Sequence, residues 1–194
     1  MIIVSETRAH SWYTGMEVGV RRRVARGYGG SLAYTWATSE NDTDGRTVLP
    51  QDPTNILADR GPAPNDARHR LTLSGIVSLP FDVQLSTVVS ARTAAPYNIT
   101  TGTDDNRDFI LSNDRPAGVQ RNSARGAAYF SADVRLTKNV SAGHSRLQII
   151  AEAFNVTNHA NWSDYDGVQA AVSFGVPASA GPPRQLQLGV RLNF

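Results

Sequence analysis

The chain has 194 residues and a formal net charge of +2, and charged residues make up 19% of it, below the roughly 25% typical of soluble domains. It has no cysteine, which excludes disulfides and thiolate metal sites, and the small net charge gives no reason to expect nucleic acid as a partner. No apolar run approaches the roughly 20 residues that a transmembrane helix requires.

Seven segments of the chain alternate apolar residues with polar or small ones. This period of two predicts β-strands with one apolar face. The most regular segment is the last, in which every even position from Leu186 to Phe194 is apolar. Helical periodicity is not sustained anywhere, so the sequence predicts an all-β fold. In chain order, the predicted strands lie near residues 12–21, 28–36, 71–79, 83–91, 130–136, 146–156 and 185–194.

The connections between these segments alternate strictly between short and long. Nine of the ten prolines fall in the long connections and none interrupts a strand, where it would remove a ladder hydrogen bond. Compact soluble domains seldom carry several structureless loops of such length, whereas outer-membrane barrels combine long external loops with short periplasmic turns. We therefore predict an antiparallel up-and-down transmembrane β-barrel segment of about seven strands. The short connections lie at 21–27, 79–82 and 138–145, and the long ones at 38–67, 93–127 and 157–184.

An odd number of strands predicts that this barrel is incomplete. If Phe194 ends on the periplasmic side, closing seven antiparallel strands would set the first and last parallel, and an open edge in lipid leaves amides unpaired at several kcal/mol each. An eighth strand within residues 1–8 is a poor candidate, because Ile2-Ile3-Val4 is short and unpatterned. The amino terminus also lacks the pattern of a secretory signal. We expect residues 1–194 to form one partial domain with upstream strands missing.

The alternation also predicts the medium that each face meets. An Arg or Lys facing lipid at the midplane costs about 2–4 kcal/mol, so charged residues within strands are expected to face the lumen. There they could contact a plug or substrate. The interpretation that we prefer is that they pair with one another or are solvated in the lumen wall. The lumen-facing candidates are Glu17, Asp133, Arg135, Glu152 and Arg191. The lipid-facing candidates are Leu71, Leu73, Val83, Leu85, Val134, Leu136, Leu186 and Leu188.

Three polar motifs have both a functional and a structural interpretation. The segment 66–70 (DARHR) fits a ligand or metal site less well than ion pairs and backbone contacts at the start of a strand, since a lone histidine has no partner at ligand spacing. The segment 41–45 (NDTDG) has the oxygen density of a calcium loop but lacks the bidentate Glu of an EF-hand, so an Asx-rich turn is favoured. The arginines of 21–23 are expected at a short turn, facing acidic head groups or a periplasmic domain. No catalytic set emerges, and we predict a protein that is not an enzyme and has no metal or cofactor.

Several pieces of the chain, taken in order, resemble the last third of the barrel of TonB-dependent receptors, and most closely the Oar-like group. They are 11–18 (SWYTGMEV) leading into the arginines of 21–23, then 34–36 (YTW), 59–61 (DRG), 65–71 (NDARHRL), 152–159 (EAFNVTNH) and 188–194 (LGVRLNF). Each piece is weak alone, but their order and spacing are fairly specific.

The resemblance implies a carboxy-terminal fragment that supplies about seven of the roughly 22 strands of such a transporter in the Gram-negative outer membrane. The whole protein would import an unidentified small ligand with energy from TonB, transmitted through a plug that this chain lacks. Val190, Leu192 and Phe194 resemble the signal read by the barrel-assembly machinery. The implied partners are outer-membrane lipid, the missing strands and plug, TonB through that plug, the assembly machinery and the ligand.

Two other hypotheses fit the alternating strands. One is a small self-contained outer-membrane barrel with a structural or adhesive role. The other is a soluble β-sandwich binding module, in which a second sheet covers the apolar face. A sandwich would bury the side chains of Leu186, Leu188, Val190 and Leu192, whereas a barrel would leave them facing lipid.

Overall fold

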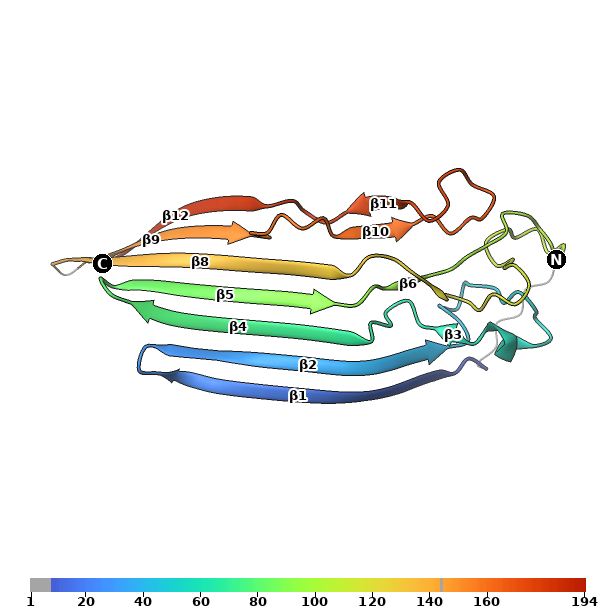
Figure 1. Cartoon of the computed structure of the whole chain (residues 1–194), viewed down its shortest axis with the longest axis horizontal. Helices are drawn as coiled ribbons and strands as arrows, with labels where there is room; N and C mark the ends of the chain where they lie inside the picture. The colour runs from blue at the N-terminus through green and yellow to red at the C-terminus, as the bar shows by residue number, and fades with distance from the viewer. Residues whose placement is uncertain (1–7, 144) are drawn as a thin grey trace.

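The computed structural model describes residues 8–143 and 145–194 and forms one large antiparallel sheet with a cluster of loops at one end (Figure 1). Among these residues, no helix is long and apolar enough to span a bilayer. The long strands are β1 (Ser11–Ala25), β2 (Tyr28–Asn41), β4 (His69–Leu79), β5 (Val83–Arg92), β8 (Tyr129–Ala142), β9 (Ser145–Phe154) and β12 (Gln185–Asn193). The shorter elements are η1 (Ile56–Asp59), β3 (Gly61–Pro62), β6 (Pro96–Tyr97), β7 (Ala124–Arg125), β10 (Trp162–Tyr165) and β11 (Pro177–Ala180).

The seven long strands follow one another across the sheet in the order β1-β2-β4-β5-β8-β9-β12, each antiparallel to the next. This confirms the predicted all-β, up-and-down architecture and its seven strands. Within the described residues the sheet does not close on itself: β1 and β12 are its edges and run in the same direction. The proposed eighth strand at Ile2-Ile3-Val4 lies outside the described residues.

Short and long connections lie at opposite ends of the sheet (Figure 1). Arg26 and Gly27 join β1 to β2 with φ values of 55° and 83°, the left-handed conformation that a two-residue hairpin turn requires. Phe81 and Asp82 also have positive φ, 64° and 56°, in the turn after β4. The carboxyl terminus lies at this end of the sheet, together with the short turns.

The prediction that the arginines of 21–23 lie in a short turn is wrong, because β1 continues through them to Ala25. The pairing with β2 shifts register between Arg22 and Ala25. A bulge of this kind lets a strand continue while its twist increases, and the turn is thereby confined to two residues. The Arg22 guanidinium lies 3.9 Å from the centre of the Tyr28 ring, so its partner is aromatic.

The described chain has almost no hydrophobic core. Its buried apolar residues are four alanines, and only two of them, Ala37 and Ala132, lie in the long strands. Leu186, Leu188 and Val190 of β12 are instead 77%, 84% and 71% exposed, and Leu192 is 57% exposed. A second sheet covering this face, as the β-sandwich hypothesis requires, is therefore absent from the described residues.

The long connections are ordered, contrary to the expectation of structureless loops. We call them loop 1 (residues 42–68), loop 2 (93–128) and loop 3 (155–184), and together the loop cap. They contain η1, β3 and two pairs of short antiparallel strands, β6–β7 and β10–β11. Most buried residues of the described chain are polar or charged residues of these loops, so the loop cap, and not the sheet, has the packed interior.

Candidate functional site

The strand register divides the predicted site residues into two sets on opposite faces of the sheet. Directly paired residues of neighbouring strands point to the same side, so one row of pairs can be followed across the sheet. The row through Leu188 joins Ala151, Leu136, Leu85 and Val77. All eight candidates for lipid contact share this apolar face: Leu71, Leu73, Val83, Leu85, Val134, Leu136, Leu186 and Leu188.

The opposite, polar face carries all five charged candidates, Glu17, Asp133, Arg135, Glu152 and Arg191. Arg135 and Glu152 are directly opposite each other in β8 and β9, and Arg135 Nε lies 3.0 Å from Glu152 Oε1. Within residues 8–143 and 145–194, Glu17 and Arg191 form no ion pair. The preferred interpretation, that these charges pair with one another, therefore holds for Arg135 and Glu152 among the five residues.

Asp133 connects the polar face to loop 3. Its Oδ1 accepts hydrogen bonds from the Asn155 N–H at 2.8 Å and from the Ser131 hydroxyl at 3.1 Å. Asn155, which is buried, donates through Nδ2 to the carbonyls of His159 and Pro182, at 2.9 and 3.2 Å, and thereby closes the base of the loop. The conformation with φ of 47° at Asn155 is one that asparagine tolerates better than most residues.

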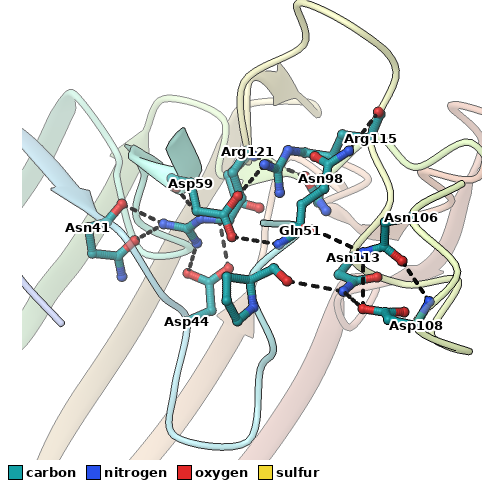
Figure 2. A network of polar contacts seen from close by, with 12 residues as sticks. Asn41, Asp44, Gln51, Asp59, Asn98, Asn106, Asp108, Asn113, Arg115 and Arg121 are labelled. Atoms are coloured by element: carbon teal, nitrogen blue, oxygen red, sulfur yellow. Dashed lines mark hydrogen bonds and ion pairs between the residues drawn. The ribbon is translucent and has the colours of Figure 1, made fainter. Parts of the chain in front are cut away.

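Loops 1 and 2 are joined by two buried arginines (Figure 2). Arg115 forms an ion pair with Asp59, and both side chains are about 95% buried, with exposed fractions of 6% and 5%. Arg121 donates through Nε to the Asp59 carbonyl at 2.8 Å and through Nη2 to the Asn41 carbonyl at 2.6 Å, and it also pairs with Asp44. Removing one partner of a buried ion pair costs about 3–5 kcal/mol, so these contacts hold the two loops in a fixed arrangement.

Close backbone approaches show how tightly the loops pack. A Cβ atom on Gly61 of loop 1 would lie 2.2 Å from the Arg121 carbonyl oxygen of loop 2. A Cβ atom on Gly167 of loop 3 would lie 1.8 Å from the Asn98 carbonyl oxygen of loop 2. Glycine is required at both positions, and all three loops therefore form one unit.

The two acidic motifs highlighted by the sequence bond to residues that are distant in the chain. Asp66 is buried, pairs with Arg125 and accepts a hydrogen bond from the Ser39 N–H at 2.9 Å, as the structural interpretation of 66–70 predicts. Asp42 accepts a hydrogen bond from the His10 N–H at 2.8 Å. The acidic side chains of 41–45 thus bond to distant residues, while the chain bends at Asp42 and Asp44, which is compatible with the Asx-rich turn favoured for this segment.

A hollow of about 440 Å³ opens where β5 and β8 enter the loop cap. Its lining includes Arg92 and Tyr129, which lie opposite each other on the polar face of the sheet. Tyr97 and Tyr165 stack beside it with ring centroids 5.3 Å apart, and Trp162 is 49% exposed. Aromatic surfaces with one cation and several hydrogen-bonding groups are typical of small-molecule sites.

One cluster that the sequence interpretation missed lies in loop 2. Asp104, Asp108 and Asp114 each bring a carboxylate oxygen to within 4.8 Å of the others. The signal in the sequence is the run Asp104, Asn106, Asp108, whose alternate spacing matches the first three ligands of an EF-hand loop. The absence of a catalytic set stays a prediction, since no contact described above tests it.

No curated protein and no solved structure matches the chain. A family model described as an outer membrane beta barrel domain matches residues 1–119 and 114–187, which is nearly the whole length. The exposed apolar face and the antiparallel meander agree with this description. The chain therefore belongs to the family of outer membrane beta barrel domains, and its place is the outer membrane.

Proposed function

We propose that this sheet is part of the wall of a TonB-dependent receptor of the Gram-negative outer membrane, which imports a small ligand. The observation that carries the proposal is the division of the sheet into two faces. One is apolar and has exposed hydrophobic side chains on six of the seven long strands, and the other carries the charged residues of the strand centres. On this proposal, lipid contacts the apolar face, and the polar face, with Glu17, Asp133, Arg135, Glu152 and Arg191, lines the lumen.

The positions of the few charged residues on the apolar face support the assignment of this face to lipid. Lys138 and Arg22 lie near the short turns and Glu40 near the loop cap. At these depths, long side chains extend to the interface and keep their charge in water. The centre of the face carries no charged residue among those described.

Aromatic residues of the apolar face fit the two interfaces of a bilayer. Trp36 lies at the loop end of the ladder that joins β2 to β4, and Tyr28 lies at its turn end. They are eight positions apart, or about 26 Å along a strand at about 3.3 Å per residue. At a tilt of about 40° the height is about 20 Å, close to the roughly 25 Å apolar band between the aromatic girdles of outer-membrane barrels.

The two free edges support a larger barrel. In a bilayer, the unpaired N–H and C=O groups of β1 and β12 require partners, and additional strands would supply them. A barrel of about 22 strands has room for a plug, which is the element through which TonB acts in the receptors that this chain resembles. The aromatic hollow beside Arg92 and Tyr129 would lie at the external mouth of the lumen, where it could receive the ligand.

The end of β12 has its own proposed partner. Val190 and Leu192 lie on the apolar face, and Phe194, the last residue, is fully exposed. We propose that these three side chains are recognised by the barrel-assembly machinery. They are free in the described structure to meet a protein surface before the strand enters lipid.

This chain has no cysteine, so, with any cysteine elsewhere in the reading frame replaced by serine, single introduced cysteines test the two faces directly. In cells that express the complete reading frame, Leu85→Cys should react with a lipid-phase maleimide, and its neighbour Ser86→Cys only with a water-soluble reagent. Equal labelling of both positions by the water-soluble reagent would refute the membrane assignment. Recovery of the protein in the soluble fraction without detergent would also refute the membrane assignment.

Transport requires a second test. A photocrosslinker placed in the periplasmic domain of TonB should capture this protein from intact outer membranes, and a TonB variant without that domain serves as the control. A protein that labels as a barrel but never crosslinks to TonB would refute the receptor proposal and favour the self-contained structural or adhesive barrel.

A further inference from the structure

The acidic cluster of loop 2 has properties that ion pairs within the chain do not explain. Asp104, Asp108 and Asp114 bring three carboxylate oxygens to within 4.8 Å of one another. Like charges at such distances repel, and a carboxylate group is costly to bury without a counter-charge. Among residues 8–143 and 145–194, no ion pair to any of these three carboxylates is formed.

Asp114 is the decisive residue. Its exposed fraction is 0%, and neither carboxylate oxygen has a hydrogen-bond partner. Buried polar groups in native proteins are nearly always paired, and an isolated buried carboxylate costs several kcal/mol. The neighbouring cation, Arg115, pairs with Asp59 instead. Two buried oxygens next to two further carboxylates offer a cation from outside the chain a site that no group of the described chain fills.

We propose that Asp104, Asp108 and Asp114 bind a calcium ion. All three donors are oxygens, and neither histidine nor cysteine takes part, which disfavours zinc. Calcium binds oxygen at about 2.3–2.6 Å, so ligands on opposite sides of the ion lie about 4.6–5.2 Å apart, whereas magnesium, at about 2.0–2.1 Å, brings them to about 4.2 Å or less. Three oxygens that all lie within 4.8 Å of one another can reach one calcium ion together. Asn113, whose buried Oδ1 is also unpartnered, is next to Asp114 in the chain.

The hydrogen bonds of the cluster leave capacity for a cation. Asp104 accepts the N–H groups of Asp108 and Phe109 at 3.0 and 3.1 Å, one on each oxygen. Asp108 Oδ2 accepts the amides of Asn113 and Asn106 at 2.7 and 3.0 Å, whereas Asp108 Oδ1 accepts only the Ile110 N–H at 2.8 Å. A carboxylate oxygen has two lone-pair sites, so Asp108 Oδ1 and either oxygen of Asp104 can still bind an ion.

Calcium at this position would stabilise the contact between loops 1 and 2. Asn113 donates to the Pro50 carbonyl at 3.2 Å, and Asn106 donates to the Gln51 carbonyl at 2.9 Å; Figure 2 shows both amides beside Asp108. Both bonds cross from loop 2 to loop 1, so loss of the ion should loosen the loop cap. The site is defined by these side chains alone and does not depend on the TonB proposal.

Calcium titration of the purified protein in detergent, after treatment with a chelator, tests the proposal. We expect one calcium ion per chain, with a dissociation constant of about 10⁻⁴–10⁻³ M, the range of extracellular calcium modules. Asp114→Asn keeps the shape of the side chain and should weaken binding at least about tenfold, because affinity depends on ligand charge. Asp105→Asn is the matched control: it removes one charge from an exposed neighbour outside the cluster.

Trypsin gives a second measurement that does not depend on calorimetry. Arg107 is exposed within the loop, so chelation should speed cleavage after it and calcium should slow it, except in Asp114→Asn. If that variant does not fold, Asp104→Asn takes its place. Absence of saturable binding up to about 10 mM, equal loss in Asp105→Asn, or equal affinity for magnesium would each overturn the calcium assignment.

Discussion

Two adjacent residues of β12 provide the sharpest test of which face meets lipid. Leu188 is the fourth of the nine residues of this strand, so it lies about 3.3 Å from the strand centre and close to the midplane of a bilayer. Its side chain is 84% exposed on the apolar face. Replacement by arginine at this depth should cost about 2–4 kcal/mol, which corresponds to a roughly 30- to 700-fold smaller folding equilibrium constant at about 1.4 kcal/mol per factor of ten.

Gln187→Arg is the matched control, because it adds the same side chain one residue away on the opposite face. Gln187 pairs with Glu152, which in turn lies beside Arg135, so the new cation has an acceptor within reach and should change stability by less than about 1 kcal/mol. Both variants are unfolded by urea in lipid vesicles and followed by heat-dependent mobility on gels. If the two variants lose equal stability, or if Leu188→Arg is the milder one, the assignment of the apolar face to lipid is refuted.

Three further predictions concern the loop cap. Gly61→Ala should destabilise the protein by about 1–3 kcal/mol through the clash with a backbone carbonyl, whereas Gly19→Ala, with nothing within 4 Å of the new Cβ, should stay within about 0.5 kcal/mol in urea unfolding. Arg115→Met should cost about 3–5 kcal/mol, because it leaves a buried carboxylate unpaired; a cost below about 1 kcal/mol by the same assay would contradict the buried pair. Hydrogen bonds from the Ser173 hydroxyl, the larger cause, and from the Val168 N–H hold the pKa of Asp166 below its ordinary value of 3.8. The ionised carboxylate therefore stabilises loop 3 above about pH 3.8, and this stabilisation is lost as the pH falls through the lowered pKa. Ser173→Ala should therefore raise the pKa of Asp166 in a carboxyl NMR titration, and an unchanged midpoint would count against that hydrogen bond.

The outcome for β1 shows what limits the prediction of element boundaries. Alternation correctly identified the strand, but the arginines of 21–23 were expected in a short turn. The strand continues because β2 offers it backbone partners as far as Tyr28, and a backbone ladder does not depend on side-chain polarity. A single sequence shows the polarity of the side chains of β1, but it does not show how far the neighbouring strand β2 pairs with it.

The segments that resemble TonB-dependent receptors show that the roles of loop residues also depend on partners elsewhere in the chain. Segments 59–61 and 152–159 stood out in the sequence without an assigned role. In the structure, Asp59 is the buried partner of Arg115, and Asn155 closes the base of loop 3. Their roles depend on residues that are distant in the chain, so no local pattern could have revealed them.

The sequence by itself determined the strands, the two faces of the sheet and the alternation of long and short connections. It could do so because side chains of a strand alternate between faces whichever strand lies beside it. Only the tertiary structure decided how the loops pack and which carboxylates remain unpaired. Arg115 and Asp59 are 56 positions apart, and Arg121 and Asn41 are 80 apart. Contacts at such separations arise only after the sheet has brought the ends of β2, β4, β5 and β8 together, and they leave no periodic trace in the chain.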